Sequence, residues 1–288
     1  MDFHTINIED NEYPPLLKEA QNAPSVLYVR GSLPEVQTST IAIVGTRKAT
    51  KASKELAYET ARDLAKAGVT VISGLAMGID TEAHRGTLDA YGTTVAVLGN
   101  GIDSVYPAQN EKLARAILEN GGGIISEYGP AEPSFAWRFI ERNRIISGLS
   151  LGVVVIEAPE RSGAISTARF AAEQGRSVFV FPSWPHNRSY EGSHELIRDG
   201  ATLVTNTAQI LEDLGINTKR ERRRVTLDLS GDEYRVVAVL SEDGKPLSID
   251  TIIELTTLEP HVASEVITTL VVEGVIKEGS TGYEISNS

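Results

Sequence analysis

The sequence predicts an α/β fold, in which a mostly parallel sheet is covered by helices on both faces and a small C-terminal domain follows. Short apolar runs rich in β-branched residues alternate with helical stretches between residues 41 and 215. Residues 231–288 change to three amphipathic helical patterns and a hairpin-like end. The length of 288 residues fits one large and one small domain, at about 150 residues per domain.

The expected strands are short and apolar throughout, which is typical of parallel strands buried on both faces. They are expected at 41–45, 69–74, 94–99, 123–129, 151–159, 177–182 and 201–204. Helical periodicity and helix-ending glycines lie between them, and these predict helices at 53–68, 81–92, 110–122, 166–175, 193–201 and 208–215.

Four segments organise the chain. Residues 1–40 form an apolar lead-in that is expected to pack on the main domain, which covers 41–215. A basic linker, 216–230, contains the run KRERRR. Residues 231–288 are expected to form three short helices and a hairpin that turns at 280–282, an arrangement typical of a winged helix-turn-helix.

The acidic residues are distributed unevenly. The net charge of −12 argues against a generally basic nucleic-acid-binding protein. However, residues 41–215 hold 17 Lys/Arg and 20 Asp/Glu, whereas 231–288 hold three and 11. The main domain can therefore concentrate positive charge in one cleft. The expected recognition helix, 261–274, has no Lys or Arg, so duplex binding by the C-terminal domain alone is not expected.

The composition excludes several kinds of site. The absence of cysteine excludes disulfides, thiolate metal sites and cysteine nucleophiles. No metal is expected, because the histidines lack metal-ligand spacing; they are His4, His84, His186, His194 and His261. No cofactor is expected either. Residues 1–15 have neither the basic start nor the apolar core that is typical of a signal peptide, and no apolar run approaches membrane-spanning length. We therefore expect a cytoplasmic protein with no membrane association.

The segments that follow the expected strands are rich in Gly, Ser and Asp. Ligands bind at the carboxyl ends of parallel strands, where exposed backbone N–H groups favour anions. The first such segment, GTRK, matches neither GxGxxG nor GxxxxGK[ST]. The glycines could instead serve only tight turns. The candidate phosphate-binding residues at these ends are Gly45, Thr46, Arg47, Lys48, Gly74, Ser162, Gly163 and Thr167.

Residues 134–150, SFAWRFIERNRIISGLS, combine arginines with aromatic residues before an expected strand. At helical spacing Arg138 and Arg142 share a face and are expected to contact successive phosphates. Trp137 and Phe139 are candidate platforms for stacked bases. Alternatively, the aromatic residues belong to the core and the arginines pair with glutamates, namely Glu127, Glu132 or Glu141. The candidate site residues here are Arg138, Phe139, Arg142, Asn143 and Arg144.

Taken together, these motifs resemble those of the DNA-processing protein A family, also called DprA or Smf. The resemblance covers nearly the whole chain, and the order and spacing of its motifs carry it. The matching stretches are IAIVGTRKAT, SGLAMGIDTEAH, VLGNGIDSVYPAQN, ISEYGP, FIERNRIISGLS, VIEAPERSGAISTARFAAEQGR and GSHELIRDGATLV. The winged-helix tail of the family is matched by residues 232–286.

The resemblance implies an extended Rossmann-like domain that binds single-stranded DNA without marked sequence preference. It also implies a homodimer that protects incoming strands and helps load the RecA recombinase during natural transformation, with no catalytic residue and no enzymatic activity. Arg47 matches an arginine of the family, and residues 142–144 match its RNR stretch. The chain departs from the family pattern at Ile140, where proline is usual, and at Ser183, where glycine is usual.

Two alternatives belong to other functional classes. One is a nucleotide-binding enzyme similar to the LOG-type phosphoribohydrolases, whose catalytic glutamate aligns with Phe170. Without that carboxylate the acid-base step has no evident agent, and Asp80 and Glu157 are expected to cap loop amides instead. The other is a nucleotide-sensing regulator with the winged helix as its output.

Overall fold

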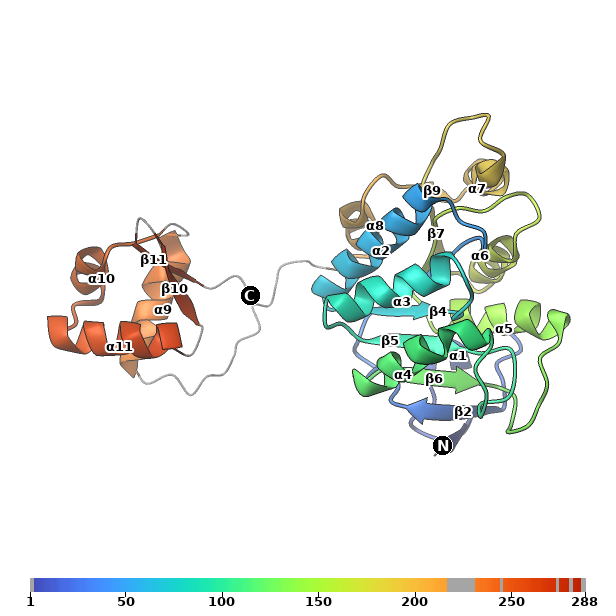
Figure 1. The fold of residues 1–288 in the computed structure, drawn as a ribbon, viewed down its shortest axis with the longest axis horizontal. Helices are drawn as coiled ribbons and strands as arrows, with labels where there is room; N and C mark the ends of the chain where they lie inside the picture. The colour runs from blue at the N-terminus through green and yellow to red at the C-terminus, as the bar shows by residue number, and fades with distance from the viewer. Residues whose placement is uncertain (1–2, 217–230, 244–245, 273–274, 280–281, 286–288) are drawn as a thin grey trace. The chain divides into compact units, whose positions relative to one another are not determined.

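The computed structural model describes residues 3–216, 231–243, 246–272, 275–279 and 282–285. The chain divides into two compact units, residues 1–218 and residues 219–288 (Figure 1). Residues 217–230, which make up nearly all of the expected basic linker, lie outside the described residues.

The larger unit is built on a nine-stranded sheet, as far as the described residues go. Its strand order is β1-β2-β6-β5-β4-β3-β7-β8-β9. Neighbours from β6 to β9 are parallel, whereas β2 is antiparallel to both β6 and β1. The strands are β1 (His4–Asn7), β2 (Val26–Gly31), β3 (Thr40–Val44), β4 (Thr70–Ser73), β5 (Thr94–Val97), β6 (Gly123–Ser126), β7 (Gly152–Val155), β8 (Ser177–Val180) and β9 (Thr202–Leu203).

Helices cover both faces of this sheet, which confirms the predicted fold class. Alternate residues of β3 point to opposite sides, so that Ala42 and Val44 belong to one core and Ile41 and Ile43 to the other. The helices are α1 (Pro15–Lys18), α2 (Lys51–Lys66), α3 (Ile79–Asp89), α4 (Glu111–Glu119), α5 (Ala136–Gly148), α6 (Gly163–Glu173), α7 (Glu191–Arg198) and α8 (Thr207–Asp213). Apolar residues of α1, α5, α6 and α7 pack on one face, and those of α2, α3 and α8 on the other.

The lead-in, 1–40, is part of the sheet, which the sequence did not predict. Its strand β2 pairs with β6 from Tyr28–Ser126 to Gly31–Gly123, and β1 then pairs with β2. Leu27 and Val29 of β2 are fully buried. The lead-in therefore covers the edge of β6 that the parallel strands leave open.

The strand order places a switch point between β3 and β7. From β3 the chain adds β4, β5 and β6 on one side, and then returns to add β7, β8 and β9 on the other. In open parallel sheets the loops that leave such a point diverge and create a crevice at the carboxyl ends. The crevice is therefore expected where residues 45–50 follow β3 and residues 156–162 follow β7.

The smaller unit contains three helices and a hairpin among its described residues. They are α9 (Gly231–Asp243), α10 (Ile249–Thr256), α11 (Pro260–Val272), β10 (Ile276–Gly279) and β11 (Gly282–Ile285). Val236, Ile252 and Ile267 meet in one apolar core, and Leu247 pairs with Tyr283 of the hairpin. This is the predicted winged-helix arrangement. Of the predicted turn, 280–282, residues 280 and 281 lie outside the described residues, and Gly282 is the first residue of β11.

A buried histidine on α3 contacts the sheet. The Thr94 hydroxyl donates to the Val71 carbonyl oxygen (2.7 Å), so it accepts from Nδ1 of His84 (2.8 Å). The Nε2 atom of His84 has no partner among the described residues. Burial, with a smaller contribution from the Arg142 charge, lowers the pKa of His84 to about 3.

We expect the larger unit to lose stability as pH falls below the ordinary histidine pKa. The unfolded chain takes up a proton on His84 near pH 6.5, whereas the folded chain stays neutral there down to about pH 3. Between pH 6.5 and pH 5 this residue should cost about 2 kcal/mol of unfolding free energy. Urea unfolding followed by tryptophan fluorescence reports this unit, because Trp137 and Trp184 both belong to it.

The matched variant is His84→Asn, which retains a hydrogen-bond donor but does not titrate. It should lose about 2 kcal/mol less than the parent over the same pH interval. Equal losses in the two proteins would show that His84 is not the titrating group.

Candidate functional site

A pocket of about 370 Å³ lies at the switch point, where β3 and β7 end. It is lined by the loop after β3, the loop after β7, and the facing residues of α5 and α6. Ten of the thirteen residues predicted from the sequence line it: Gly45, Thr46, Arg47, Lys48, Phe139, Arg142, Asn143, Ser162, Gly163 and Thr167. Gly74, Arg138 and Arg144 are not part of the lining.

The loop after β3 is fixed by its neighbours. The Thr46 N–H donates to the Glu157 carbonyl oxygen (2.7 Å), which joins this loop to the end of β7. Gly78 has a φ of +87°, and a Cβ atom there would lie 2.4 Å from the Thr46 carbonyl oxygen. Only glycine therefore allows α3 to begin so close to the loop.

The exposed cations of the pocket are Arg47, Lys48 and Arg161. Among the described residues, none of these three side chains has an ion-pair or hydrogen-bond partner. The Arg47 guanidinium lies 5.6 Å from the centre of the Phe139 ring, a cation–π distance. Arg161 was not among the predicted site residues, although its stretch, EAPERSG, follows a strand on the same edge.

Arg142 has a different role from the one predicted. Its side chain is only 4% exposed, and its guanidinium donates to the carbonyl oxygens of Gly74 (2.8 Å) and Val97. A Cβ atom at Gly74 would lie 2.6 Å from this guanidinium, which explains the glycine there. The prediction that Arg138 and Arg142 both contact phosphates is therefore wrong for Arg142, because its guanidinium is hydrogen-bonded to carbonyl oxygens at the strand ends.

Two buried carboxylates cap backbone groups around the pocket, as predicted. Asp80 accepts from the N–H groups of Gly74 (3.2 Å) and Ala76 (3.3 Å). Glu157 accepts from both the N–H and the hydroxyl of Thr50 (3.0 Å each), at the start of α2. Burial raises the pKa of Asp80, and the Arg142 charge opposes this shift. Burial also lowers the pKa of Arg142 to about 10, so it stays charged at neutral pH.

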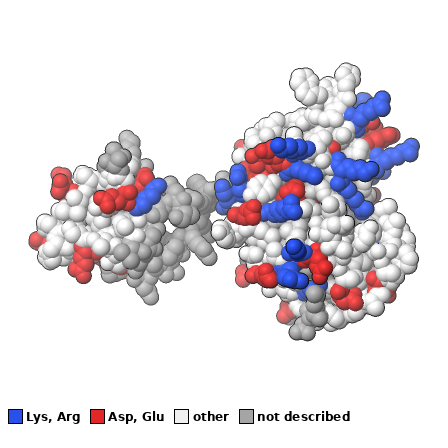
Figure 2. Space-filling view, in the orientation of Figure 1, with Lys and Arg blue, Asp and Glu red and all other residues white. Residues whose placement is uncertain are grey.

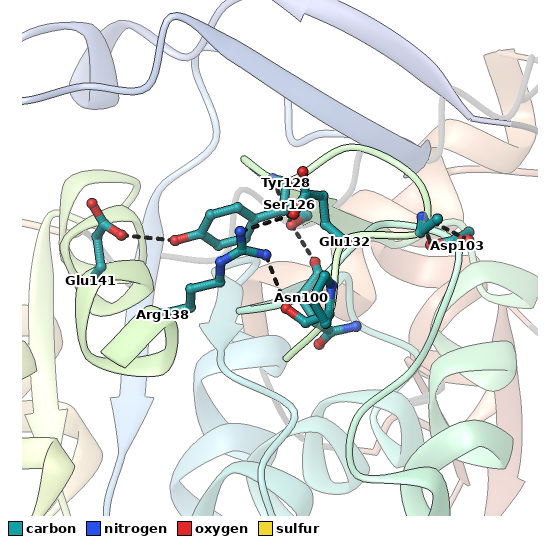
Figure 3. A network of polar contacts seen from close by, with 9 residues as sticks. Asn100, Asp103, Ser126, Tyr128, Glu132, Arg138 and Glu141 are labelled. Atoms are coloured by element: carbon teal, nitrogen blue, oxygen red, sulfur yellow. Dashed lines mark hydrogen bonds and ion pairs between the residues drawn. The ribbon is translucent and has the colours of Figure 1, made fainter. Parts of the chain in front are cut away.

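The side chain of Arg138 is held by the loop before α5. It forms an ion pair with Glu132 (2.9 Å) and donates to the Pro133 carbonyl oxygen (2.9 Å). Figure 3 shows it lying against the ring of Tyr128, 4.2 Å from the ring centre. The Tyr128 hydroxyl donates to Glu141 (2.8 Å). The predicted alternative of glutamate pairing is therefore confirmed for Arg138.

The same loop is joined to the ends of β5 and β6. The Ser126 hydroxyl donates to the Asn100 carbonyl oxygen (2.6 Å) and accepts from the Tyr128 N–H (3.0 Å) (Figure 3). The Asp103 carboxylate accepts from the Ala131 N–H (3.0 Å). These contacts fix the loop from which α5 begins.

Asn143 and Arg144 connect α5 to its surroundings. The Asn143 amide donates to the Gly163 carbonyl oxygen (3.1 Å) and the Ser166 hydroxyl (3.0 Å), which joins α5 to α6. Arg144 forms an ion pair with Glu127, again the predicted glutamate alternative. Burial raises the pKa of Glu127 and the Arg144 charge opposes the rise.

Aromatic side chains are exposed next to the pocket. Trp137 is 56% exposed, so it is not a core residue, and its ring stacks on Phe135 at 6.2 Å between centres. Phe139 is half-buried and contacts Tyr106, with ring centres 5.2 Å apart. Ile140, the residue found where the family usually has proline, is also exposed. Rings and unpaired cations therefore lie side by side at the pocket mouth.

Within the described ranges, no cluster of His, Asp and Glu could hold a metal ion. No helix there is long and apolar enough to cross a membrane.

The chain is similar in sequence to a known protein family. The family model described as DNA recombination-mediator protein A matches residues 4–215. Protein Smf of Escherichia coli is 44% identical over 211 residues, which cover 73% of this chain and 56% of that protein. DNA processing protein DprA of Streptococcus pneumoniae is 38% identical over 211 residues, covering 73% and 74%. The chain thus spans little more than half the length of the E. coli relative.

Two solved structures share the fold. The X-ray structure of DNA processing protein A from S. pneumoniae superposes with a TM-score of 0.69 at 38% identity, covering 74% of this chain and 75% of that one. The Helicobacter pylori protein, described for its unique single-stranded DNA binding mode, gives 0.67 at 31% identity, covering 74% and 96%. With the family model matched from residue 4 to residue 215, the chain belongs to the DNA recombination-mediator protein A family.

Proposed function

We propose that the larger unit binds single-stranded DNA at the switch-point pocket. The observation that carries this proposal is the group of three unpaired cations, Arg47, Lys48 and Arg161, next to exposed aromatic rings. Lysine and arginine neutralise phosphates without reading sequence. Aromatic faces stack on any base. The single-stranded DNA binding described for the H. pylori relative also supports it.

The phosphate site is the loop from Gly45 to Lys48. This loop is tied to Glu157 and packed against Gly78, so its backbone is fixed before a ligand arrives. Arg47 lies over the Phe139 ring, which positions the charge at the pocket mouth. The ligand is a phosphate of the DNA backbone, with Trp137 and Phe139 available to the bases on either side.

We propose binding rather than catalysis for this pocket. The carboxylates that could act as acid or base, Asp80 and Glu157, each accept two hydrogen bonds from neighbouring groups. Phe170 occupies the position of the phosphoribohydrolase glutamate. Incubation with nucleoside monophosphates followed by an assay for released ribose tests the enzymatic alternative.

The first expected outcome concerns strand preference. The protein should bind a labelled single strand at least about five-fold more tightly than the matching duplex, equivalent to one stacked base at about 1 kcal/mol. Bases of a duplex are already stacked on each other and cannot use the rings. Fluorescence anisotropy at two salt concentrations measures both affinities. Equal affinity for the two forms would contradict the proposal.

The second outcome separates Arg47 from Arg142. Arg47→Ala should weaken single-strand binding and reduce the slope of log affinity against log salt by about 0.7, the share of one phosphate contact. Its unfolding free energy should be nearly unchanged, because the side chain is exposed. Arg115→Ala on α4 is the matched control, an exposed arginine away from the pocket, and should bind like the parent.

Arg142→Ala should behave differently, since it removes a buried charge that bonds two strand ends. It should lose about 3–5 kcal/mol of stability, because Asp80 is left without its compensating charge. Urea unfolding measures this loss. A stable Arg142→Ala variant with the salt slope of Arg47→Ala would show instead that Arg142 contacts phosphate.

We further propose, on the family resemblance, that the protein acts as a homodimer that delivers bound strands to the RecA recombinase. It should accelerate the DNA-dependent ATP hydrolysis of RecA on strands already covered by single-strand-binding protein, because it holds the backbone while a competing protein is displaced. Arg47→Ala should give less acceleration. Unchanged RecA activity at saturating protein would refute this delivery role, and sedimentation velocity tests the dimer.

A further inference from the structure

The loop between β8 and α7 presents a tryptophan at the same edge of the sheet as the pocket. Its sequence, SWPHNRSYEG, covers residues 183–192. Trp184 is 84% exposed, one of the most exposed large apolar side chains among the described residues. Exposure of this tryptophan leaves a large apolar surface in water, where it is accessible to a binding partner.

Hydrogen bonds hold this loop in place. The Asn187 N–H donates to the Trp184 carbonyl oxygen (2.9 Å), and the Asn187 amide donates to the Ser183 hydroxyl (3.0 Å). The Ser183 backbone also contacts the His194 ring on α7 (3.1 Å). Trp184 is therefore displayed on an ordered turn.

The loop is hydrogen-bonded to two elements that flank the proposed phosphate site. The Tyr190 hydroxyl bonds to the Ser53 hydroxyl (2.8 Å) in the first turn of α2. Ser193 exchanges two hydrogen bonds with Ala158 in the loop after β7, each 3.0 Å. The segment 183–193 thus contacts the loop after β7 and the first turn of α2, the helix that follows the loop after β3.

The surface around these contacts is positively charged, in a chain whose net charge is −12. Its exposed cations, none with an ion-pair partner among the described residues, are Arg47, Lys48, Lys51, Lys54, Arg161 and Arg188. The exposed acidic residues of the same segments are fewer, namely Glu55, Glu160, Glu191 and Glu195, and the buried Glu157 is already bonded to Thr50. In Figure 2, Lys and Arg side chains gather in the part of the larger unit where Figure 1 shows α2, α6 and α7.

We propose that the β8–α7 loop is a second contact for the same DNA strand, with Trp184 stacking on a base and Arg188 contacting a phosphate. This assignment rests on the proposed single-strand binding, and it extends the stretch of DNA that the protein contacts. Strand β8 lies two inter-strand spacings from β3, about 10 Å. A stacked strand covers that distance in about three nucleotides.

Charge favours nucleic acid over protein as the occupant. A tryptophan in a protein interface is typically surrounded by apolar residues in a core depleted of charge. Trp184 instead belongs to a loop with Arg188 and continues into a surface of unpaired cations, which suits a polyanion with aromatic bases. The partner is therefore an extended single strand.

The experiment compares two lengths of oligothymidine by fluorescence anisotropy. The short one, of two nucleotides, covers about 7 Å and fills the pocket only, and the long one, of about 16 nucleotides, also reaches the loop. Trp184→Ala should leave the short-strand affinity unchanged and weaken long-strand binding about five-fold or more, the loss of one stacked base. Trp184→Phe should restore most of the loss, and Tyr91→Ala, an exposed aromatic on the opposite edge, is the matched control.

Fluorescence provides a second, direct readout. The chain has two tryptophans, so in Trp137→Phe the emission comes from Trp184 alone. The long strand should quench this emission, because a stacked base contacts the indole, and the short strand should not. Far-ultraviolet circular dichroism shows whether each variant remains folded.

The outcomes separate the two proposals. If the parent binds neither strand, the proposed function fails and this assignment with it. If the parent binds both strands but Trp184→Ala binds the long one equally well and Trp184 is not quenched, only the second contact is overturned. A changed sedimentation coefficient of Trp184→Ala with unchanged strand affinity would also overturn it, and would assign the loop to an interface between copies of the chain.

Discussion

The architecture of the site depends on one buried cation. Arg142 reaches from α5 to the carbonyl oxygens at the ends of β4 and β5, and its charge lies near the buried carboxylate of Asp80. Asp80 in turn accepts from the N–H groups of Gly74 and Ala76. An unpaired charge in the protein interior is costly. Removing either Arg142 or Asp80 therefore destabilises the contacts that the other one makes. Helix α5, and the aromatic residues on it, are positioned by these contacts.

The polar residues of helix α5 attach it to the rest of the unit, whereas its aromatic residues are exposed. Arg142 faces the strand ends, Asn143 bonds to α6, and Arg144 pairs with Glu127. The aromatic residues near its first turn remain accessible, with Phe135 and Trp137 stacked on each other. A helix docked by three separate polar contacts can display exposed rings without depending on them for stability.

Much of the fold was predictable because short apolar runs between helical stretches admit few arrangements. Ten of thirteen site residues converge on one pocket, since ligand sites of parallel sheets occur at strand ends. The role of Arg142 was not predictable: the i, i+4 spacing places Arg138 and Arg142 on one helical face, but only the three-dimensional fold brings the Gly74 and Val97 carbonyls to that face. Strand β2 was missed because its partner, β6, lies far away in the sequence.

The fixed loop after β3 has a kinetic consequence. Its backbone is tied to Glu157 and enclosed by Gly78, so the conformational entropy of ordering it is lost when the protein folds rather than when a ligand binds. A preformed site needs no rearrangement before contact, so encounter is governed by diffusion and electrostatic attraction. If the site holds single-stranded DNA as proposed, the lifetime of the complex then depends on how many phosphates and bases are bound at once. Such a site binds a strand quickly, and differences in affinity arise from the rate of dissociation.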